Sequence, residues 1–144
     1  MQVSQPAALV CTFTWTGFVC GISFLEAWLK FRAPGITLPI GLGIGRLVFG
    51  ALNKVEWVFA VIVTLSAILY GGPLLRLPHL YLLVILTVLL LQTCWLLPAL
   101  DARAELQIHH QPVTNSYLHF YFIGAEFIKT LLLIAYGLSL FKRS

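Results

Sequence analysis

The sequence predicts an all-α integral membrane protein: one bundle of four transmembrane helices, with a Pro/Gly-rich, partly interfacial connection between the first and second helices. Hydrophobic residues make up 60% of the 144 positions and charged residues only 10%, and the mean hydropathy is +0.94. Soluble domains carry about 25% charged residues. The low charge and the high hydropathy together indicate that most of this chain lies in lipid.

Four apolar stretches approach the roughly 20 residues that a helix needs to cross a bilayer. They cover residues 7–29, 57–72, 80–97 and 117–141. Strand-like alternation of polar and apolar residues is absent from them, and backbone groups in lipid must be satisfied within their own segment, so we expect helices. These stretches use up the chain, which predicts a single transmembrane domain over residues 1–144.

The first stretch is expected to stay in the protein, because residues 1–6 contain no Lys or Arg and the stretch ends at Glu26 and Lys30, not at a small-residue cleavage site.

Four helices place both termini on one side of the membrane. Five basic residues flank the opposite side and three flank the terminal side, which favours a cytoplasmic location for the first and third loops. The five are Lys30, Arg32, Arg46, Lys54 and Arg103, and the three are Arg76, Lys142 and Arg143. The net charge of +4 resides in these flanks, so nucleic acid is not an expected partner.

The connection between the first two stretches is rich in proline and glycine. Pro34 and Pro39 should end the first helix and start another near Leu38, which continues into the second stretch. The sequence Gly41-Leu-Gly-Ile-Gly45 follows no strand and lacks the spacing of a phosphate-binding loop. The pairs Gly17/Gly21 and Gly41/Gly45 have the spacing that lets helices approach closely, and packing alone is the simpler explanation for them.

The cysteines and histidines do not form a redox or metal motif. The cysteines are Cys11, Cys20 and Cys94, without a CxxC pair. We therefore expect buried, inert thiols and no thiol–disulfide enzyme. His79 and His119 begin helices at opposite membrane faces, and His109-His110 lies in a polar loop. No metal site and no haem ligation are expected.

The clearest candidates for function are Glu126 and Lys129, which lie three residues apart inside the fourth apolar stretch. Each costs about 2.5–3.5 kcal/mol at the centre of a membrane helix on insertion scales. His119 lies two turns earlier on the same stripe. Because successive helices alternate in direction, polar residues of the other helices fall toward the same membrane side: Ser23, Glu26, Lys30, Asn53, Glu56, Gln92 and Asp101. This asymmetry predicts a polar pocket or half-channel that opens toward the first and third loops.

A purely structural role is the alternative for these charges. Glu26 and Lys30 can neutralise each other as an i,i+4 pair, and Glu126 and Lys129 as an i,i+3 pair. Such pairs can serve only to fix helix register. Basic side chains near helix ends, such as Lys30 and Arg32, can also extend along the apolar surface to the membrane interface.

A local resemblance suggests one ligand. The segment Lys30-Phe-Arg-Ala-Pro34, with Arg46, Asn53 and Glu56 downstream, resembles the membrane-associated proteins in eicosanoid and glutathione metabolism (MAPEG). Those are four-helix proteins, often trimeric, whose second helix binds glutathione through an Arg, an Asn seven residues later and a Glu three further. The resemblance implies that Arg46, Asn53 and Glu56 hold the charged ends of glutathione. Phe49 stands where the family usually has a second basic residue.

A second resemblance spans the whole chain. The segments Leu25-Glu-Ala, Ala51-Leu-Asn-Lys-Val-Glu56 and Leu97-Pro-Ala-Leu-Asp101-Ala-Arg103, with His119, Glu126 and Lys129, are similar to a group of uncharacterised small bacterial four-helix membrane proteins. This similarity implies a multi-pass protein of the bacterial inner membrane. It implies no reaction.

Three functions remain open at this point. The first is a bundle that binds a small polar or anionic ligand in a one-sided pocket, with glutathione as the cofactor that the resemblance implies. The candidate ligand-binding residues are Glu26, Lys30, Arg46, Asn53, Glu56, His119, Glu126 and Lys129. The second is an accessory subunit of a membrane complex, which would purify with a stoichiometric partner. The third is a small proton-coupled transporter that works as a homo-oligomer, whose flux would depend on Glu26 or Glu126. No residue is assigned a catalytic role.

Overall fold

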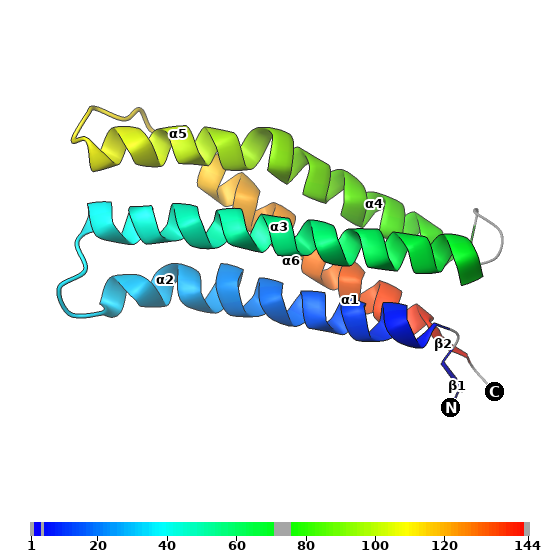
Figure 1. Cartoon of the computed structure of the whole chain (residues 1–144). Coiled ribbons are helices and arrows are strands. Elements are labelled where there is room, and N and C mark those ends of the chain that lie inside the picture. The colour runs from blue at the N-terminus through cyan, green and yellow to red at the C-terminus, as the bar shows by residue number, and fades with distance from the viewer. Residues whose placement is uncertain (1, 4, 71–75, 143–144) are drawn as a thin grey trace.

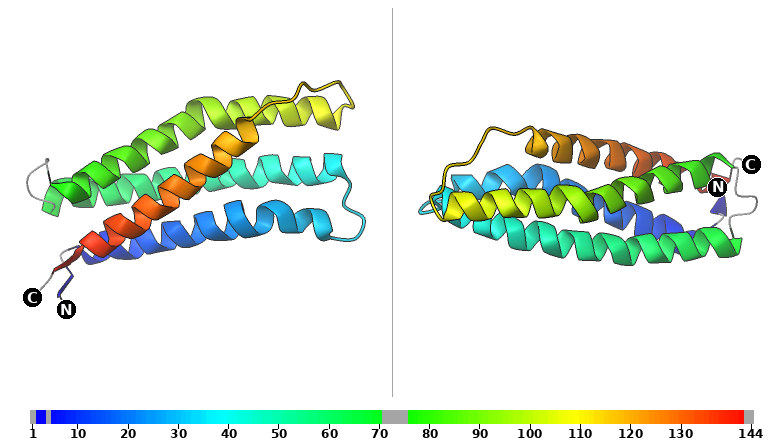
Figure 2. Two further views of the ribbon diagram at one scale, coloured as in Figure 1. Left: turned by 180° about the vertical axis from the view of Figure 1, so that it is seen from behind. Right: turned by 90° about the horizontal axis from the view of Figure 1, so that it is seen from above.

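The computed structural model describes residues 2–3, 5–70 and 76–142. Four helical segments, Pro6–Arg32, Leu38–Tyr70, Leu77–Ile108 and Leu118–Ser139, are long and apolar enough to cross a membrane. Figure 1 shows them side by side in one elongated bundle, and Figure 2 shows the last of them, α6, crossing the others obliquely. The predicted all-α, four-helix, multi-pass architecture is confirmed.

The first segment is continuous but changes its helical geometry along its length. It consists of α1 (Pro6–Val19), a π-helix η1 (Cys20–Glu26), α2 (Ala27–Leu29) and a 3₁₀ turn η2 (Lys30–Arg32). The helix ends where the sequence predicted, because Ala33 adopts an extended conformation (ψ 135°). The helical region is sterically disfavoured for a residue that precedes proline.

The second segment, α3 (Leu38–Tyr70), is a single helix of 33 residues. Its start at Leu38 was predicted, and so was its continuation into the apolar stretch that follows. At 1.5 Å per residue it is about 50 Å long, whereas a bilayer core is about 30 Å thick. Arg46, Asn53 and Glu56 therefore lie on one rigid element. The predicted end of this apolar stretch at residue 72 lies outside the described residues.

The third segment extends beyond the predicted stretch of residues 80–97. It comprises α4 (Leu77–Leu91), a π-helix η3 (Gln92–Leu96) and α5 (Leu97–Ile108). Proline normally interrupts a helix by removing a donor and clashing with the preceding turn. Here Pro98 lies in the first turn of α5, directly after the wider π-turn, and the helix continues with a bend that is visible in Figure 1. This extension brings Asp101 and Glu105 onto the same helix as Gln92.

The fourth segment, α6 (Leu118–Ser139), completes the bundle. Two very short strands, β1 (Gln2–Val3) and β2 (Phe141–Lys142), pair in antiparallel fashion and hold the two ends of the chain together. Both therefore lie at the same end of the bundle, opposite the connections α2–α3 and α5–α6 (Figure 1).

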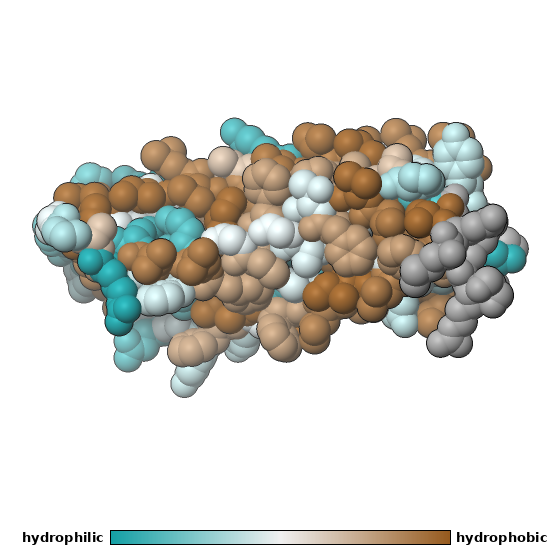
Figure 3. All heavy atoms as spheres, turned by 90° about the horizontal axis from the view of Figure 1, so that it is seen from below, coloured by the Kyte–Doolittle hydropathy of each residue, from teal (hydrophilic) through white to brown (hydrophobic). Residues whose placement is uncertain are grey.

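The bundle has an apolar half and a polar half. Apolar packing near the termini involves α1, α3, α4 and α6, with Trp15, Val63, Ile85, Leu133 and Tyr136 at most 1% exposed. In Figure 3 apolar side chains cover most of the visible face, and hydrophilic ones gather mainly toward the end with the connections α2–α3 and α5–α6. A surface of this kind suits lipid along most of the bundle's length.

Gly41 and Gly45 bring the first segment close to α3. A Cβ at Gly41 would overlap the ring of Phe31, and a Cβ at Gly45 would lie 3.1 Å from the Lys30 Nζ. The expected close approach therefore exists at this pair. At Gly17 and Gly21 a Cβ would meet nothing within 4 Å among the described residues, so that pair makes no such approach within this chain.

Gly41→Ala is expected to be less stable than Gly43→Ala by about 1–3 kcal/mol, the usual cost of overpacking. Both changes gain the helix propensity of alanine, about 0.8–1.0 kcal/mol. Only the first forces Phe31 to move, because a Cβ at Gly43 meets nothing within 4 Å. Thermal unfolding of both variants in detergent measures the difference. Equal stabilisation by the two would show that Phe31 is not packed against α3.

Candidate functional site

A buried ion cluster lies at the centre of the bundle. We use this name for Trp15, Glu56, Gln92, Glu126 and Lys129, which come from all four helical segments and are at most 2% exposed. The Lys129 Nζ lies 2.5 Å from Glu56 Oε1 and 3.0 Å from Glu126 Oε1. It also donates a hydrogen bond of 2.6 Å to Gln92 Oε1. A lysine has three donors, so this ammonium group is fully satisfied without solvent.

Two further hydrogen bonds complete the cluster. The Gln92 side-chain amide donates to Glu126 Oε1 over 2.7 Å, and the Trp15 indole N–H donates to Glu56 Oε1 over 2.9 Å. Hydrogen bonds to charged groups are roughly twice as strong as neutral ones, and the low dielectric of the interior strengthens them further. The cluster therefore joins four helices through one polar centre.

The charges of the cluster do not balance. It contains two carboxyl groups, Glu56 and Glu126, and one amine, Lys129, so full ionisation leaves one net negative charge. The second oxygen of Glu126, Oε2, is buried and has no hydrogen-bond partner among the described residues. All donors of Lys129 in the cluster are therefore satisfied, whereas one acceptor of Glu126 is not.

A neutral polar group lies beside the cluster. The Thr93 hydroxyl accepts hydrogen bonds from Asn53 Nδ2 and from the Trp57 indole N–H, each over 2.9 Å. The same hydroxyl donates to the Leu89 carbonyl one turn earlier. Asn53 on α3 is therefore held in place by its hydrogen bond to Thr93 on η3.

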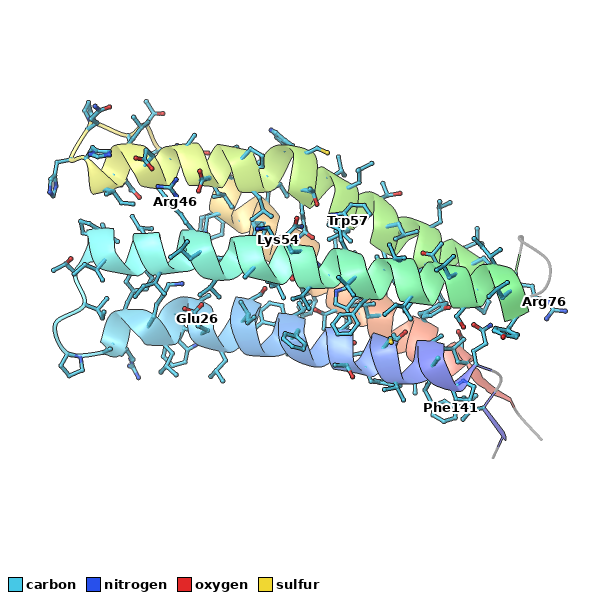
Figure 4. The ribbon with its side chains drawn as sticks, viewed as in Figure 1. Glu26, Arg46, Lys54, Trp57, Arg76 and Phe141 are labelled. Carbon is cyan, nitrogen blue, oxygen red and sulfur yellow. The ribbon has the colours of Figure 1, made fainter. Side chains whose placement is uncertain are left out.

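Arg46 connects α3 to α5 nearer the loops. Its guanidinium contacts both carboxylate oxygens of Asp101, at 2.5 and 3.0 Å, and also pairs with Glu105. Figure 4 shows Arg46 between these two helices. The three side chains are 30–51% exposed, so solvent screens the pairing at this position. The Glu105 carboxylate also contacts His109 over 2.9 Å.

Lys30 lies between a carboxylate and two aromatic rings. Its Nζ is 3.2 Å from Glu26 Oε2, which is the i,i+4 contact that the sequence predicted. The same atom lies 5.5 Å from the ring centre of Phe31 and 5.4 Å from that of Phe49. Cations are attracted to ring faces at these distances.

Two adjacent cavities lie on this side of the bundle. The first has a volume of about 520 Å³, and its polar lining comprises Lys30, Arg46, Asn53, Thr93, Asp101 and His119. The second has a volume of about 380 Å³ and reaches the buried ion cluster at Glu126, with Ser23, Phe24 and Trp28 in its wall. Both are lined by Ala27, Phe31, Phe49, His119 and Phe122.

The eight predicted site residues divide among these features. Glu56, Glu126 and Lys129 form the ionic part of the cluster. Lys30, Arg46 and Asn53 line the first cavity, and the exposed His119 lines both. Glu26 pairs with Lys30 and lines neither cavity. The three residues that the resemblance assigns to glutathione do not lie together, because Glu56 contacts Lys129 while Arg46 and Asn53 line the first cavity.

Sequence reasoning did not identify Trp15 and Thr93 as site residues, and it noted Gln92 only by its depth. One signal for Trp15 was available: it lies in the middle of an apolar helix, away from the interfaces where tryptophan can reach water. A buried indole N–H needs an acceptor. Gln92 and Thr93 both lie in the π-helix η3, and π-turns inside α-helices occur frequently at functional sites.

Comparison of the chain with protein-family models, with curated proteins and with solved structures finds no match.

Proposed function

We propose that the protein binds a small polar or anionic ligand in the first cavity, within the membrane and near the α2–α3 connection. The observation that carries this proposal is the convergence of two cationic side chains on that cavity. The Lys30 ammonium has three donors and one ion-pair partner, Glu26, among the described residues. Arg46 has five donors and makes three hydrogen bonds to Asp101 and Glu105. Both cations retain donors for a ligand.

The cavity also suits the apolar part of a ligand. Its volume of about 520 Å³ lies within the range of roughly 300–1,000 Å³ that is usual for small-molecule sites. Phe31, Phe49 and Phe122 provide apolar walls, and Phe49 packs edge-on against Phe122 with ring centres 5.3 Å apart. A ligand with anionic or polar groups at one end and apolar atoms at the other fits this arrangement.

Glutathione is the specific ligand within this proposal. Its carboxylates match the donors of Lys30 and Arg46, and Asn53 supplies an amide in the same cavity. This choice, the homo-oligomeric state and the bacterial inner membrane as location all derive from the sequence resemblances. We rank ligand binding above transport and above an accessory role because polar donors line a preformed cavity.

Glutathione at millimolar concentration is expected to raise the melting temperature of the protein in maltoside micelles. A ligand at 100 times its Kd stabilises a protein by about 2.7 kcal/mol. Lys30→Ala and Asn53→Ala should abolish the shift. Lys54→Ala is the matched control, because Lys54 is exposed on the same helix as Asn53 and lines neither cavity.

The absence of a shift with glutathione would exclude this ligand. A shift with another small dicarboxylate such as succinate, lost in Lys30→Ala, would retain ligand binding and correct only its identity. A shift that persists in both cavity variants would contradict the proposed site.

A further inference from the structure

One residue that lines the second cavity carries an acceptor that nothing in the described chain uses. Glu126 is 1% exposed and lines this cavity, and its Oε2 is buried without a hydrogen-bond partner among the described residues. Ser23 lines the same cavity, and its hydroxyl is also buried without a partner among the described residues. A buried polar atom left without a partner is destabilising, and more so when it is charged. This wall of the cavity therefore favours a ligand that donates a hydrogen bond or carries a positive charge.

The charge of the buried ion cluster points the same way. Glu56 and Glu126 face one Lys129, whose three donors are occupied by Glu56, Gln92 and Glu126. Of the ionisable groups that line the second cavity, only His119 accompanies Glu126. One positive charge at Oε2 would neutralise the cluster, whereas an anion at this place would add to the excess.

The walls of the cavity indicate which kind of cation fits. Five aromatic residues line it: Phe24, Trp28, Phe31, Phe49 and Phe122. Aromatic rings in this region already attract the chain's own cations, because Lys30 lies over two of them and the Arg32 guanidinium lies 5.1 Å from the Trp28 ring. Aromatic walls with a carboxylate are the arrangement that recognises organic ammonium groups.

Smaller cations fit less well. A metal ion such as Ca²⁺ requires about 6–8 oxygen ligands, whereas the unpartnered acceptors here are one carboxylate oxygen and one hydroxyl. No cluster of three or more metal-ligating side chains occurs in the part of the chain that the structure describes. A proton would neutralise Glu126 but would leave a volume of about 380 Å³ unfilled.

We infer that the second cavity binds an organic monovalent cation whose ammonium group pairs with Glu126 and packs against the aromatic walls. This site is separate from the proposed function, which concerns the cationic lining of the first cavity. The two cavities share one wall, so a single chain would bind groups of opposite charge on either side of Phe31, Phe49 and Phe122.

Choline and dimethylbutanol, its uncharged carbon isostere, test the inference. The two have the same shape, so their difference in affinity measures recognition of the charge. Calorimetric titration of the purified protein in maltoside micelles should give at least about tenfold tighter binding of choline. Glu126→Gln should lose this preference. It preserves the length of the side chain and its acceptor for Lys129 and Gln92.

Two further variants keep the test decisive if Glu126→Gln folds poorly. Trp28→Leu, at a residue that is 50% exposed, should weaken choline binding more than dimethylbutanol binding. Glu105→Gln removes the same charge at a residue that lines neither cavity, and it should bind choline like the parent protein.

Equal affinity for the two compounds, or a preference that persists in Glu126→Gln, would overturn the inference. Proton uptake by Glu126 without choline binding would also overturn it. Glutathione-dependent stabilisation should survive in Glu126→Gln, because Glu126 does not line the first cavity. The two proposals can therefore fail independently.

Discussion

Lys129→Met is expected to lower the free energy of unfolding by about 3–5 kcal/mol, the usual cost of removing one partner from a buried ion pair. Lys129 is 0% exposed and holds two carboxyl groups, Glu56 and Glu126. Methionine fills a similar volume but leaves both acids without their cation. Unfolding in mixed micelles with increasing SDS measures the change. Lys54→Met, at an exposed position of α3, is the matched control and should change stability by less than about 0.5 kcal/mol.

Neutralising the acids should restore most of the lost stability. We expect the triple variant Lys129→Met, Glu56→Gln, Glu126→Gln to unfold close to the parent protein, because it leaves no uncompensated buried charge and glutamine keeps the size of each acid. A single Lys129→Met variant as stable as the parent would contradict the finding that Lys129 is buried and fully paired. If the triple variant is no more stable than Lys129→Met alone, the loss of stability results from altered packing and not from the unpaired acids.

Trp15→Phe is expected to cost about 1.5–3 kcal/mol, because it removes a hydrogen bond to a charged, buried acceptor. The Trp15 indole donates to Glu56 over 2.9 Å in a site that is 0% exposed. Trp57→Phe is the matched control. It removes an indole hydrogen bond of the same length, but the acceptor is the neutral Thr93 hydroxyl in a partly buried site. About 0.5–1.5 kcal/mol is expected there.

A double-mutant cycle separates the hydrogen bond from the lost ring volume. Trp15→Phe combined with Glu56→Gln should show a coupling energy of about 0.5–3 kcal/mol, as residues in one network do. Trp57→Phe combined with Glu56→Gln should be nearly additive. Additivity in both cycles would mean that Trp15 stabilises the bundle by packing alone.

Local sequence patterns predicted much of the fold. Hydropathy identified the four helices, and Pro34 with Pro39 placed the break between the first two and the start of α3 at Leu38. The third helix extends beyond the predicted apolar stretch of residues 80–97, because its last part, α5, carries Asp101, Arg103 and Glu105 and is not apolar throughout. The helix also continues through Pro98, which follows the π-helix η3.

The candidate site was predictable only where partners lie on one helix. The pairs Glu26–Lys30 and Glu126–Lys129 follow from spacings of four and three residues. Arg46 was grouped with Asn53 and Glu56 by the sequence resemblance, which assigns all three residues of this helix to one ligand. In the structure Arg46 pairs with Asp101 and Glu105, which are 55 and 59 residues away. These partners lie on a facing helix. The sequence of one helix does not show which residues of the neighbouring helix it will contact.

The sequence by itself determined that this chain spans a membrane with four helices and that its charged residues gather toward one side, because burying charge in lipid is costly enough to make the pattern visible. Only the tertiary structure decided that Lys129 faces two acids and one amide, that Trp15 completes the cluster, and that Glu126 Oε2 stays unpartnered beside an aromatic cavity. The physical reason is that each of these features depends on side chains from different helices meeting at one depth. Packing across the bundle sets how each helix is rotated about its own axis, and so which side chains point inward. The ratio of acidic to basic groups in the buried ion cluster then decides which charge the site can bind.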